Sequence, residues 1–314
     1  MTTAEAAEAL AAWGGGPPPR LIKDRENAVY EVYLTDGTHA ALRLHRPGYQ
    51  SADAIRSELI WTGGLATAGL PVPRPVPGAQ GALIHTLTTG RVASVVEWVA
   101  GRPLGEAWTP LPGAPAEQAN TFHRIGALLA RLHAATDALT LPPGFTRPAW
   151  DEDGLLGDSP LWGRFWENPA LTMPERATLD AARSEARARL QALRPGADYG
   201  LIHADLMREN LLVDGPTLRL IDFDDSGFGF RLYDLGTLMI QNLDEPAYPD
   251  LLAAAAAGYA SLRPLDAPLI PMFVMLRCLA SCGWAVPRLP PGSPRLRDYA
   301  TRAVRQAEAF LAAT

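Results

Sequence analysis

Two aspartates and an asparagine in the second half of the chain have the types and spacing of a metal-dependent site. They are Asp205, Asn210 and Asp222. Two carboxylates and a carboxamide oxygen, with no thiol and no paired imidazole, form a set of hard oxygen donors. Such a set suits Mg²⁺ and does not suit Zn²⁺. The residues therefore predict a magnesium site, provided that the fold brings them together.

The chain around these residues predicts the element that positions them. The apolar runs at residues 210–213 and 218–223 are typical of short β-strands. Asp214-Gly215 between the two runs predicts a hairpin turn. We expect the hairpin to bring all three side chains to one end of a small sheet.

The same stretch resembles the catalytic and metal loops of protein-kinase-like enzymes, whose pattern is H-R-D-x4-N followed by D-F-G. The corresponding residues here are His203-Ala204-Asp205, Asn210 and Asp222-Phe223-Asp224. The motif differs from the protein-kinase pattern by an alanine in place of arginine and an aspartate in place of glycine. With these two differences it resembles the motif of the family of aminoglycoside phosphotransferases, choline kinases and type II-like homoserine kinases. The resemblance is specific over Leu201–Leu235 and weaker, but in the right order, over residues 20–135.

This resemblance implies a role for each matched residue. Asp205 stands where the catalytic base stands, and Asn210 and Asp222 stand where the metal-binding residues stand. Asp234 matches the aspartate that holds the catalytic-loop backbone, and His203 belongs to the same support. The implied reaction transfers the γ-phosphoryl group of ATP, in the presence of Mg²⁺, to a hydroxyl group that the base orients.

The resemblance also implies an α+β, two-lobed protein-kinase-like fold. The predicted small lobe contains five antiparallel strands at residues 20–25, 28–35, 38–45, 82–87 and 91–99. Asp36-Gly37 and Thr89-Gly90 predict the turns of two hairpins among these strands. Ser51 predicts the N-cap of the helix of this lobe, and Thr172-x-x-Glu175 is the capping box of a later helix. We expect residues 1–19 to form a helix and linker, 20–99 the small nucleotide-binding lobe, and 100–314 a mainly α-helical catalytic and acceptor-binding lobe.

Arg43 and Glu58 occupy the positions of the strand cation that holds the ATP phosphates and the helix glutamate that orients it. An arginine can pair with phosphate or carboxylate through its fork of donors. An exposed strand arginine and a solvated glutamate are the alternatives. Strand alternation separates Arg43 from Leu42 and Leu44. If those leucines pack under the helix, Arg43 reaches the site only through a bulge or a twist.

The rest of the expected nucleotide site is less distinctive. The turn at residues 24–27 lies where a kinase has its phosphate loop, but it contains no glycine. The segment Glu97–Pro103, which begins at the end of the fifth strand, resembles the hinge that reads adenine, and the backbone of Glu97 and of Val99 would do so here. Trp98 between them is expected to pack rather than to stack on the nucleotide.

The expected acceptor is a small molecule with a hydroxyl group, and Asp224 and Asp225 could bind it if it is cationic, or could assist the metal. Residues 141–168 combine tryptophans with acids, which is typical either of an acceptor-binding insert or of a satellite core. His133 is expected to be a hydrogen-bonded core residue. A protein kinase of the same family, or a nucleotide-binding pseudokinase without turnover, are the rival readings. The acceptor's identity and the oligomeric state stay open.

Composition excludes several other classes. The chain has 314 residues, 47% of them hydrophobic, and a formal net charge of −6, so nothing favours a nucleic-acid partner. We expect no secretory signal and no membrane-spanning run, hence a cytoplasmic protein. Cys278 and Cys282 are expected to be buried thiols rather than a disulfide or a zinc site. Three helices are predicted at residues 249–262, 268–284 and 293–313, and a glycine-permitted turn at 227–229.

Overall fold

The computed structural model describes residues 2–313, which form two compact units. The first unit contains the chain up to Pro103, together with Ala138–Arg147 and Leu211–Asp224. The second contains Leu104–Asp137, Pro148–Asn210 and the chain from Asp225 onward. The boundaries at residues 19 and 99 that the sequence suggests stay a prediction.

A five-stranded antiparallel sheet forms the centre of the first unit. Its strands are β1 (Arg20–Asp24), β2 (Ala28–Tyr33), β3 (His39–Leu44), β4 (Ile84–Thr86) and β5 (Val92–Glu97). Their order in the sheet is β1-β2-β3-β5-β4. All five strands and both hairpins were predicted, because the apolar alternation and the Asp36-Gly37 and Thr89-Gly90 turns mark them in the sequence.

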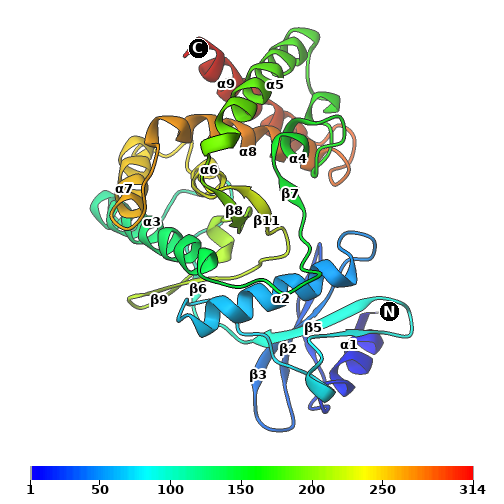
Figure 1. Cartoon of the computed structure of the whole chain (residues 1–314). Coiled ribbons are helices and arrows are strands. Elements are labelled where there is room, and N and C mark those ends of the chain that lie inside the picture. Colours follow the sequence, from blue (N-terminus) through cyan, green and yellow to red (C-terminus); the bar gives the residue numbers. More distant parts are fainter. Residues whose placement is uncertain (1, 314) are drawn as a thin grey trace. The chain divides into compact units, whose positions relative to one another are not determined.

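Two helices cover opposite faces of this sheet (Figure 1). Helix α1 (Thr2–Ala11) packs on the face that carries Leu42 and Leu44, and it shares one hydrophobic cluster with β2, β3 and β5. Helix α2 (Ala52–Thr67) begins at its predicted N-cap Ser51, whose side chain accepts a hydrogen bond from the Ala54 N–H. This helix lies on the face of Arg43.

Arg43 would need a bulge or a twist only if Leu42 and Leu44 packed under α2, and this condition is not met. The ladders of β3 with β2 and with β5 run without a register shift through Arg43. No bulge is needed because the leucine face packs on α1, so α2 takes the other face of the strand, to which simple alternation directs Arg43.

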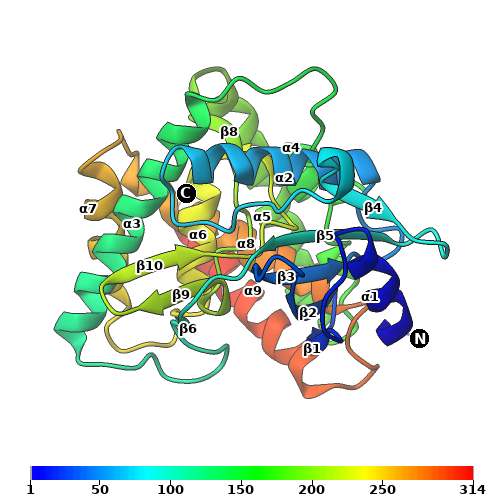
Figure 2. The ribbon, with the colours of Figure 1, turned by 90° about the horizontal axis from the view of Figure 1, so that it is seen from below.

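The predicted active-site hairpin also belongs to the first unit (Figure 2). It consists of β9 (Leu211–Asp214) and β10 (Thr217–Leu220), and β6 (Arg102–Pro103) pairs with β9. Asp214 pairs with Thr217, so the turn is Gly215-Pro216, one residue later than expected. The second strand ends at Leu220 rather than at Phe223, because Asp222 has a φ of 67° and cannot continue a ladder.

The second unit is mostly helical. Its helices are α3 (Pro115–Asp137), α4 (Glu152–Leu156), α5 (Met173–Leu193), α6 (Leu232–Ile240), α7 (Tyr248–Ala260), α8 (Ile270–Ala285) and α9 (Pro294–Ala312). Short 3-10 turns occur at Ala79–Gly81 in the first unit and at Phe165–Glu167, Arg194–Gly196, Arg208–Asn210 and Ala267–Leu269 in the second. Helices α3 and α7 lie side by side in both views (Figures 1 and 2). The predicted capping box of Thr172 and Glu175 starts α5.

A small sheet in the second unit supports the catalytic loop. Strand β11 (Gly227–Phe230) pairs with β8 (Tyr199–Ile202) and with β7 (Ala149–Trp150). The sequence-based turn at residues 227–229 was wrong. The glycines serve close approach: a Cβ on Gly227 would lie 2.4 Å from the Pro148 oxygen, and one on Gly229 would lie 2.5 Å from Ile202 Cδ1.

Helix α8 is buried on nearly every side. Together with the preceding turn it forms the one helical stretch among residues 2–313, Ala267–Ala285, that is long and apolar enough to cross a membrane. The expectation of no such run was therefore wrong by length and composition. Most of the stretch is buried among other elements of the second unit, as in a core helix. Cys278 and Cys282 are free buried thiols on it, as predicted, and burial raises the pKa of each to about 12.

Candidate active site

The backbone of His203 and Ala204 is held by one buried carboxylate in the second unit, that of Asp234. Asp234, in the first turn of α6, accepts the N–H of His203 at 2.9 Å and the N–H of Ala204 at 2.7 Å. Ala204 has a φ of 64°, a conformation that an alanine adopts only when its surroundings impose it. Asp234 therefore has the supporting contact that the resemblance implies for it.

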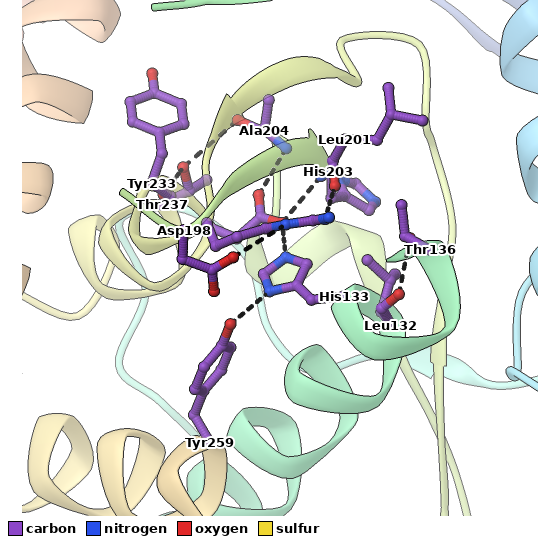
Figure 3. A network of polar contacts seen from close by, with 12 residues as sticks. Leu132, His133, Thr136, Asp198, Leu201, His203, Ala204, Tyr233, Thr237 and Tyr259 are labelled. Atoms are coloured by element: carbon purple, nitrogen blue, oxygen red, sulfur yellow. Dashed lines mark hydrogen bonds and ion pairs between the residues drawn. The ribbon is translucent and has the colours of Figure 1, made fainter. Parts of the chain in front are cut away.

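A buried histidine continues this support to the helices behind the loop. His133 on α3 contacts Asp234 Oδ2 at 3.0 Å through Nε2 and the Tyr259 hydroxyl of α7 at 2.8 Å through Nδ1 (Figure 3). Burial lowers the pKa of His133, so its imidazole is neutral. Because a carboxylate only accepts, Nε2 carries the proton and Nδ1 accepts from Tyr259. The prediction of a hydrogen-bonded core histidine is confirmed.

The carboxylate of Asp205 receives a donor on each oxygen. Arg277 Nη2, from α8, lies 2.7 Å from Oδ1, and Asn210 Nδ2 lies 3.0 Å from Oδ2. Asn210 Nδ2 also donates to the backbone oxygen of Asp205 at 2.8 Å. The side chain of Asp205 is 22% exposed. It is thus fixed in direction and still open to a ligand, as a group that orients a hydroxyl must be.

Aromatic residues line the surroundings of Asp205 in the second unit. The guanidinium of Arg277 lies 4.1 Å from the centre of the Trp162 ring. Asp225 accepts the indole N–H of Trp162 at 3.3 Å on Oδ1 and that of Trp150 at 2.8 Å on its backbone oxygen. Trp150 and Trp162 are both buried. These two tryptophans of the stretch 141–168 are therefore core residues, and both contact a second carboxylate residue, Asp225, in the same unit as Asp205.

The first unit contains the ion pair that the resemblance implies. Arg43 Nη2 lies 2.5 Å from Glu58 Oε1, and both side chains are almost fully buried. Burial by itself lowers the pKa of Arg43, but Glu58, Asp224 and Asp222 together raise it above its ordinary value. The guanidinium therefore stays charged. Binding of the ATP phosphates by Arg43 remains a prediction.

Asp224 differs from Asp222 in its surroundings. Asp222 is exposed, whereas Asp224 is buried and lies 3.7 Å from Nδ1 of His45. Burial by itself raises the pKa of Asp224. The combined effect of His45, Arg43 and Arg147 is larger and lowers the pKa below its ordinary value, so Asp224 is ionised. Arg147 also donates to the backbone oxygen of Asp224 at 2.6 Å. Because Asp224 is buried and held by these contacts, it is better placed to support the loop around Asp222 than to bind an acceptor.

The strand end predicted to read adenine is partly used by the protein itself. The N–H of Glu97 donates to the Arg74 oxygen at 2.8 Å. The carbonyl of Glu97 and the backbone of Val99 are the groups that this contact leaves for a nucleotide. Trp98 stacks on His39 with ring centres 4.7 Å apart, so it packs against the sheet of its own unit. Packing of Trp98 between the lobes stays a prediction.

Sequence reasoning missed Arg277, His45 and Arg147. A signal existed for Arg277, because it is the one charged residue in the otherwise apolar stretch Ile270–Ala285, and a buried charge requires a partner. His45 and Arg147 gave no comparable signal, since His45 comes directly after an ordinary strand and Arg147 lies in an irregular segment.

The small antiparallel sheet with its helix, and the mainly helical unit that holds the H-x-D-x4-N loop, define a protein-kinase-like phosphotransferase. Residues 19–265 match the phosphotransferase enzyme family APH, and the chain belongs to that family. Its relatives are kinases of small molecules, so the protein is a phosphotransferase that acts on a hydroxyl acceptor. Membership of this family implies ATP as the co-substrate.

Three relatives illustrate the range of the family. The chain is 26% identical to the amicoumacin kinase of Bacillus subtilis, over 86% of this chain and 81% of that protein. It is 34% identical to a homoserine kinase of Pseudomonas aeruginosa, over 67% of this chain and 63% of that protein. The solved structure of a microcompartment-associated aminopropanol kinase superposes with a TM-score of 0.80 at 32% identity, covering 94% of this chain and 92% of that one.

Proposed function

We propose that this protein transfers the γ-phosphoryl group of Mg-ATP to the hydroxyl group of a small amino alcohol, with Asp205 as the base. The observation that carries the proposal is the fixed carboxylate of Asp205. Both of its oxygens are held by donors, its backbone neighbours are held by Asp234, and part of its surface is open. A base placed in this way orients the acceptor hydroxyl and takes its proton as the phosphoryl group moves.

Asn210 and Asp222 are the proposed metal ligands. Asn210 commits its Nδ2 to Asp205, which leaves its amide oxygen as the donor for a cation. The oxygen chemistry of the two side chains fits Mg²⁺. Bound Mg²⁺ would offset the negative charge of the phosphates. The positive φ of Asp222 also marks it as a residue held in an unusual conformation, which is frequent at functional sites.

In the proposed nucleotide site, Arg43 binds phosphate oxygens while Glu58 holds its direction. The adenine contacts are assigned to the carbonyl of Glu97 and to the backbone of Val99. The missing glycine loop does not oppose this assignment. The side chain of Asn27, at the end of that turn, accepts the N–H of Arg46 at 2.8 Å and so fixes the turn without glycine.

For the acceptor, Asp225 is a better candidate than Asp224. Asp225 lies in the same unit as Asp205 and is only partly buried, whereas Asp224 is buried and faces His45. A carboxylate near tryptophan rings favours a cationic group on the acceptor. Relatives named for homoserine and aminopropanol point to the same chemistry.

The test is a Mg²⁺-dependent assay of ADP release with homoserine, 1-amino-2-propanol, choline and hygromycin B as acceptors. We expect turnover with at least one amino alcohol. Asp205→Asn should leave the KM for ATP nearly unchanged and lower kcat by roughly 10²–10⁴-fold, the usual contribution of a general base. Wild-type turnover in the asparagine variant would remove Asp205 from this role, and no turnover with any acceptor would contradict the reaction itself.

A further inference from the structure

The charge of Arg277 is unusual for its place in the fold. It lies in the middle of α8, where 14 of the 16 residues are buried, and is itself 2% exposed. Burying a guanidinium in such a helix is costly unless it is paired, and an apolar side chain of similar volume is often as stable or more stable. Packing alone therefore does not explain an arginine at this position.

The guanidinium of Arg277 is held from three directions. Nη1 donates to Ser281 Oγ at 2.7 Å, one turn along α8. Its plane lies against the ring of Trp162, and Nη2 reaches Asp205 Oδ1. Since the side chain is fixed by these contacts, the direction in which Nη2 points is fixed as well.

Asp205 needs such a contact because a carboxylate rotates easily about its last torsion. Asn210 holds one oxygen, and Arg277 holds the other, so together they define the plane of the carboxylate. Each carboxylate oxygen has two acceptor positions, so both oxygens can still bind the acceptor hydroxyl. Among the described residues, the titratable groups near this point include Tyr233 of α6, Asp225 and His203, and Cys278 and Tyr299 lie near Arg277.

We propose that Arg277 is a positioning residue for the transfer reaction: it fixes the carboxylate plane of Asp205 from helix α8. The inference rests on the proposed function, because it acts through Asp205. It assigns a role to a residue outside the H-x-D-x4-N and D-F-D motifs.

The experiment compares Arg277→Met and Arg277→Lys with a matched control, Arg302→Met. Arg302 on α9 likewise pairs with an aspartate, Asp244 at 3.0 Å, and lies over a tryptophan, Trp108, at 4.2 Å. ADP release is measured with the best of the four acceptors above, or with water alone if none is faster. We expect Arg277→Met to lower kcat by about 10- to 100-fold, the range of one charged hydrogen bond. The KM for ATP should stay within about two-fold.

Arg277→Lys should recover part of the loss because it restores the charge without the fork, and Arg302→Met should behave as wild type. Ser281→Ala, which loosens Arg277 without removing it, should give a smaller loss in the same direction. Thermal unfolding of every variant separates lost turnover from lost folding. Unchanged kcat in both Arg277→Met and Ser281→Ala would overturn the proposal, as would an equal loss in Arg302→Met.

A double-variant cycle separates this inference from the assignment of Asp205. If Arg277 acts through Asp205, adding Arg277→Met to Asp205→Asn should change kcat by no more than about two-fold. Multiplying losses would overturn the positioning role while leaving Asp205 as the base. Wild-type turnover in Asp205→Asn alone would instead contradict the proposed function.

Discussion

Arg43 stands where a kinase-like enzyme has its strand cation, and its surroundings explain how an arginine fills that position. Its partner Glu58 is 2% exposed, and neither Arg43 Nε nor Glu58 Oε2 has a hydrogen-bond partner among residues 2–313. One donor and one acceptor of the pair are thus unsatisfied, and both atoms are buried. The exposed part of the guanidinium is the part that a phosphate would meet, with the Arg43–Glu58 contact left intact.

Replacing Arg43 should therefore weaken ATP binding. We expect Arg43→Ala to cost roughly 1.5–3 kcal/mol of binding free energy, the range of a charged hydrogen bond. Arg43→Lys should recover part of it, and Glu58→Gln should show a smaller loss in the same direction. Isothermal titration with ATP and Mg²⁺ measures these differences.

Because Arg43→Ala also leaves Glu58 buried without its partner, the stability of each variant must be measured without nucleotide. The double variant Arg43→Ala/Glu58→Gln removes both charges and serves as the control for this effect. ATP binding by Arg43→Ala equal to that of the wild type would show that the phosphate contact is wrong.

Individual site residues could be predicted from the sequence where their types follow a motif with fixed spacing. Asp205, Asn210, Asp222 and Asp234 could be named because their chemistry is tied to fixed intervals along the chain. Arg277 could not be assigned to Asp205, because 72 residues separate them and only the packing of α8 brings them together. Pairings of that kind depend on tertiary structure, which spacing does not encode.

The elements behind the catalytic loop form a support that includes a buried neutral histidine. His133 links α3 to α7 through Tyr259 and to α6 through Asp234. Below about pH 6.5 the unfolded chain binds a proton at this imidazole. Burial lowers the pKa of His133 in the folded protein, so the folded chain binds that proton only at lower pH. The free energy of unfolding should consequently fall as the pH falls from 7 towards the lowered pKa.

Urea denaturation of wild type and His133→Gln between pH 7.5 and 5.5 measures this contribution. The variant should be less stable at pH 7.5, and its stability should fall less steeply with acidification, by at most about 1.4 kcal/mol per pH unit. His123→Gln, on the exposed side of the same helix, is the control and should follow the wild type. Parallel curves for wild type and His133→Gln would show that His133 does not couple folding to pH.

Elements with regular patterns were predicted well, whereas the glycine-rich segment after the D-F-D motif was not. Alternation and turn dipeptides identified the five strands of the first sheet, and capping residues located α2 and α5. A turn was predicted at residues 227–229 because glycine is common in turns. Residues 227–230 form a strand instead, in which the neighbours of Gly227 and Gly229 approach too closely for a Cβ, and nothing in the local sequence distinguishes the two uses.

Ligand binding should increase the stability of the whole molecule against unfolding. A ligand that binds only the folded protein stabilises it by about 2.7 kcal/mol at 100 times its Kd. We expect ATP with Mg²⁺ to raise the Tm of the wild type. Asp222→Ala should lose most of the magnesium-dependent part, because a carboxylate ligand is missing and phosphate charge is no longer offset.

The Tm of each protein is measured with ATP in EDTA and with ATP in MgCl₂. The difference between the two Tm values is the magnesium-dependent part of the stabilisation. The control is Asp214→Ala, which removes a carboxylate at the turn between β9 and β10, the hairpin that precedes Asp222 in the chain. This variant should retain the difference in Tm. An unchanged magnesium dependence in Asp222→Ala would remove Asp222 from the metal site.

The two thiols on α8 have a consequence for how the protein can be observed. Burial raises the pKa of Cys278 and of Cys282 to about 12, so neither forms appreciable thiolate in the folded protein at neutral pH. A thiol reagent such as DTNB should react only when α8 opens, and its rate at saturating reagent then reports the opening rate. Cys278 is adjacent to Arg277 in the chain, so the reaction of these two native thiols reports local unfolding beside Asp205 without any engineered probe. Fast labelling of the native protein would show that this helix opens far more readily than its burial implies.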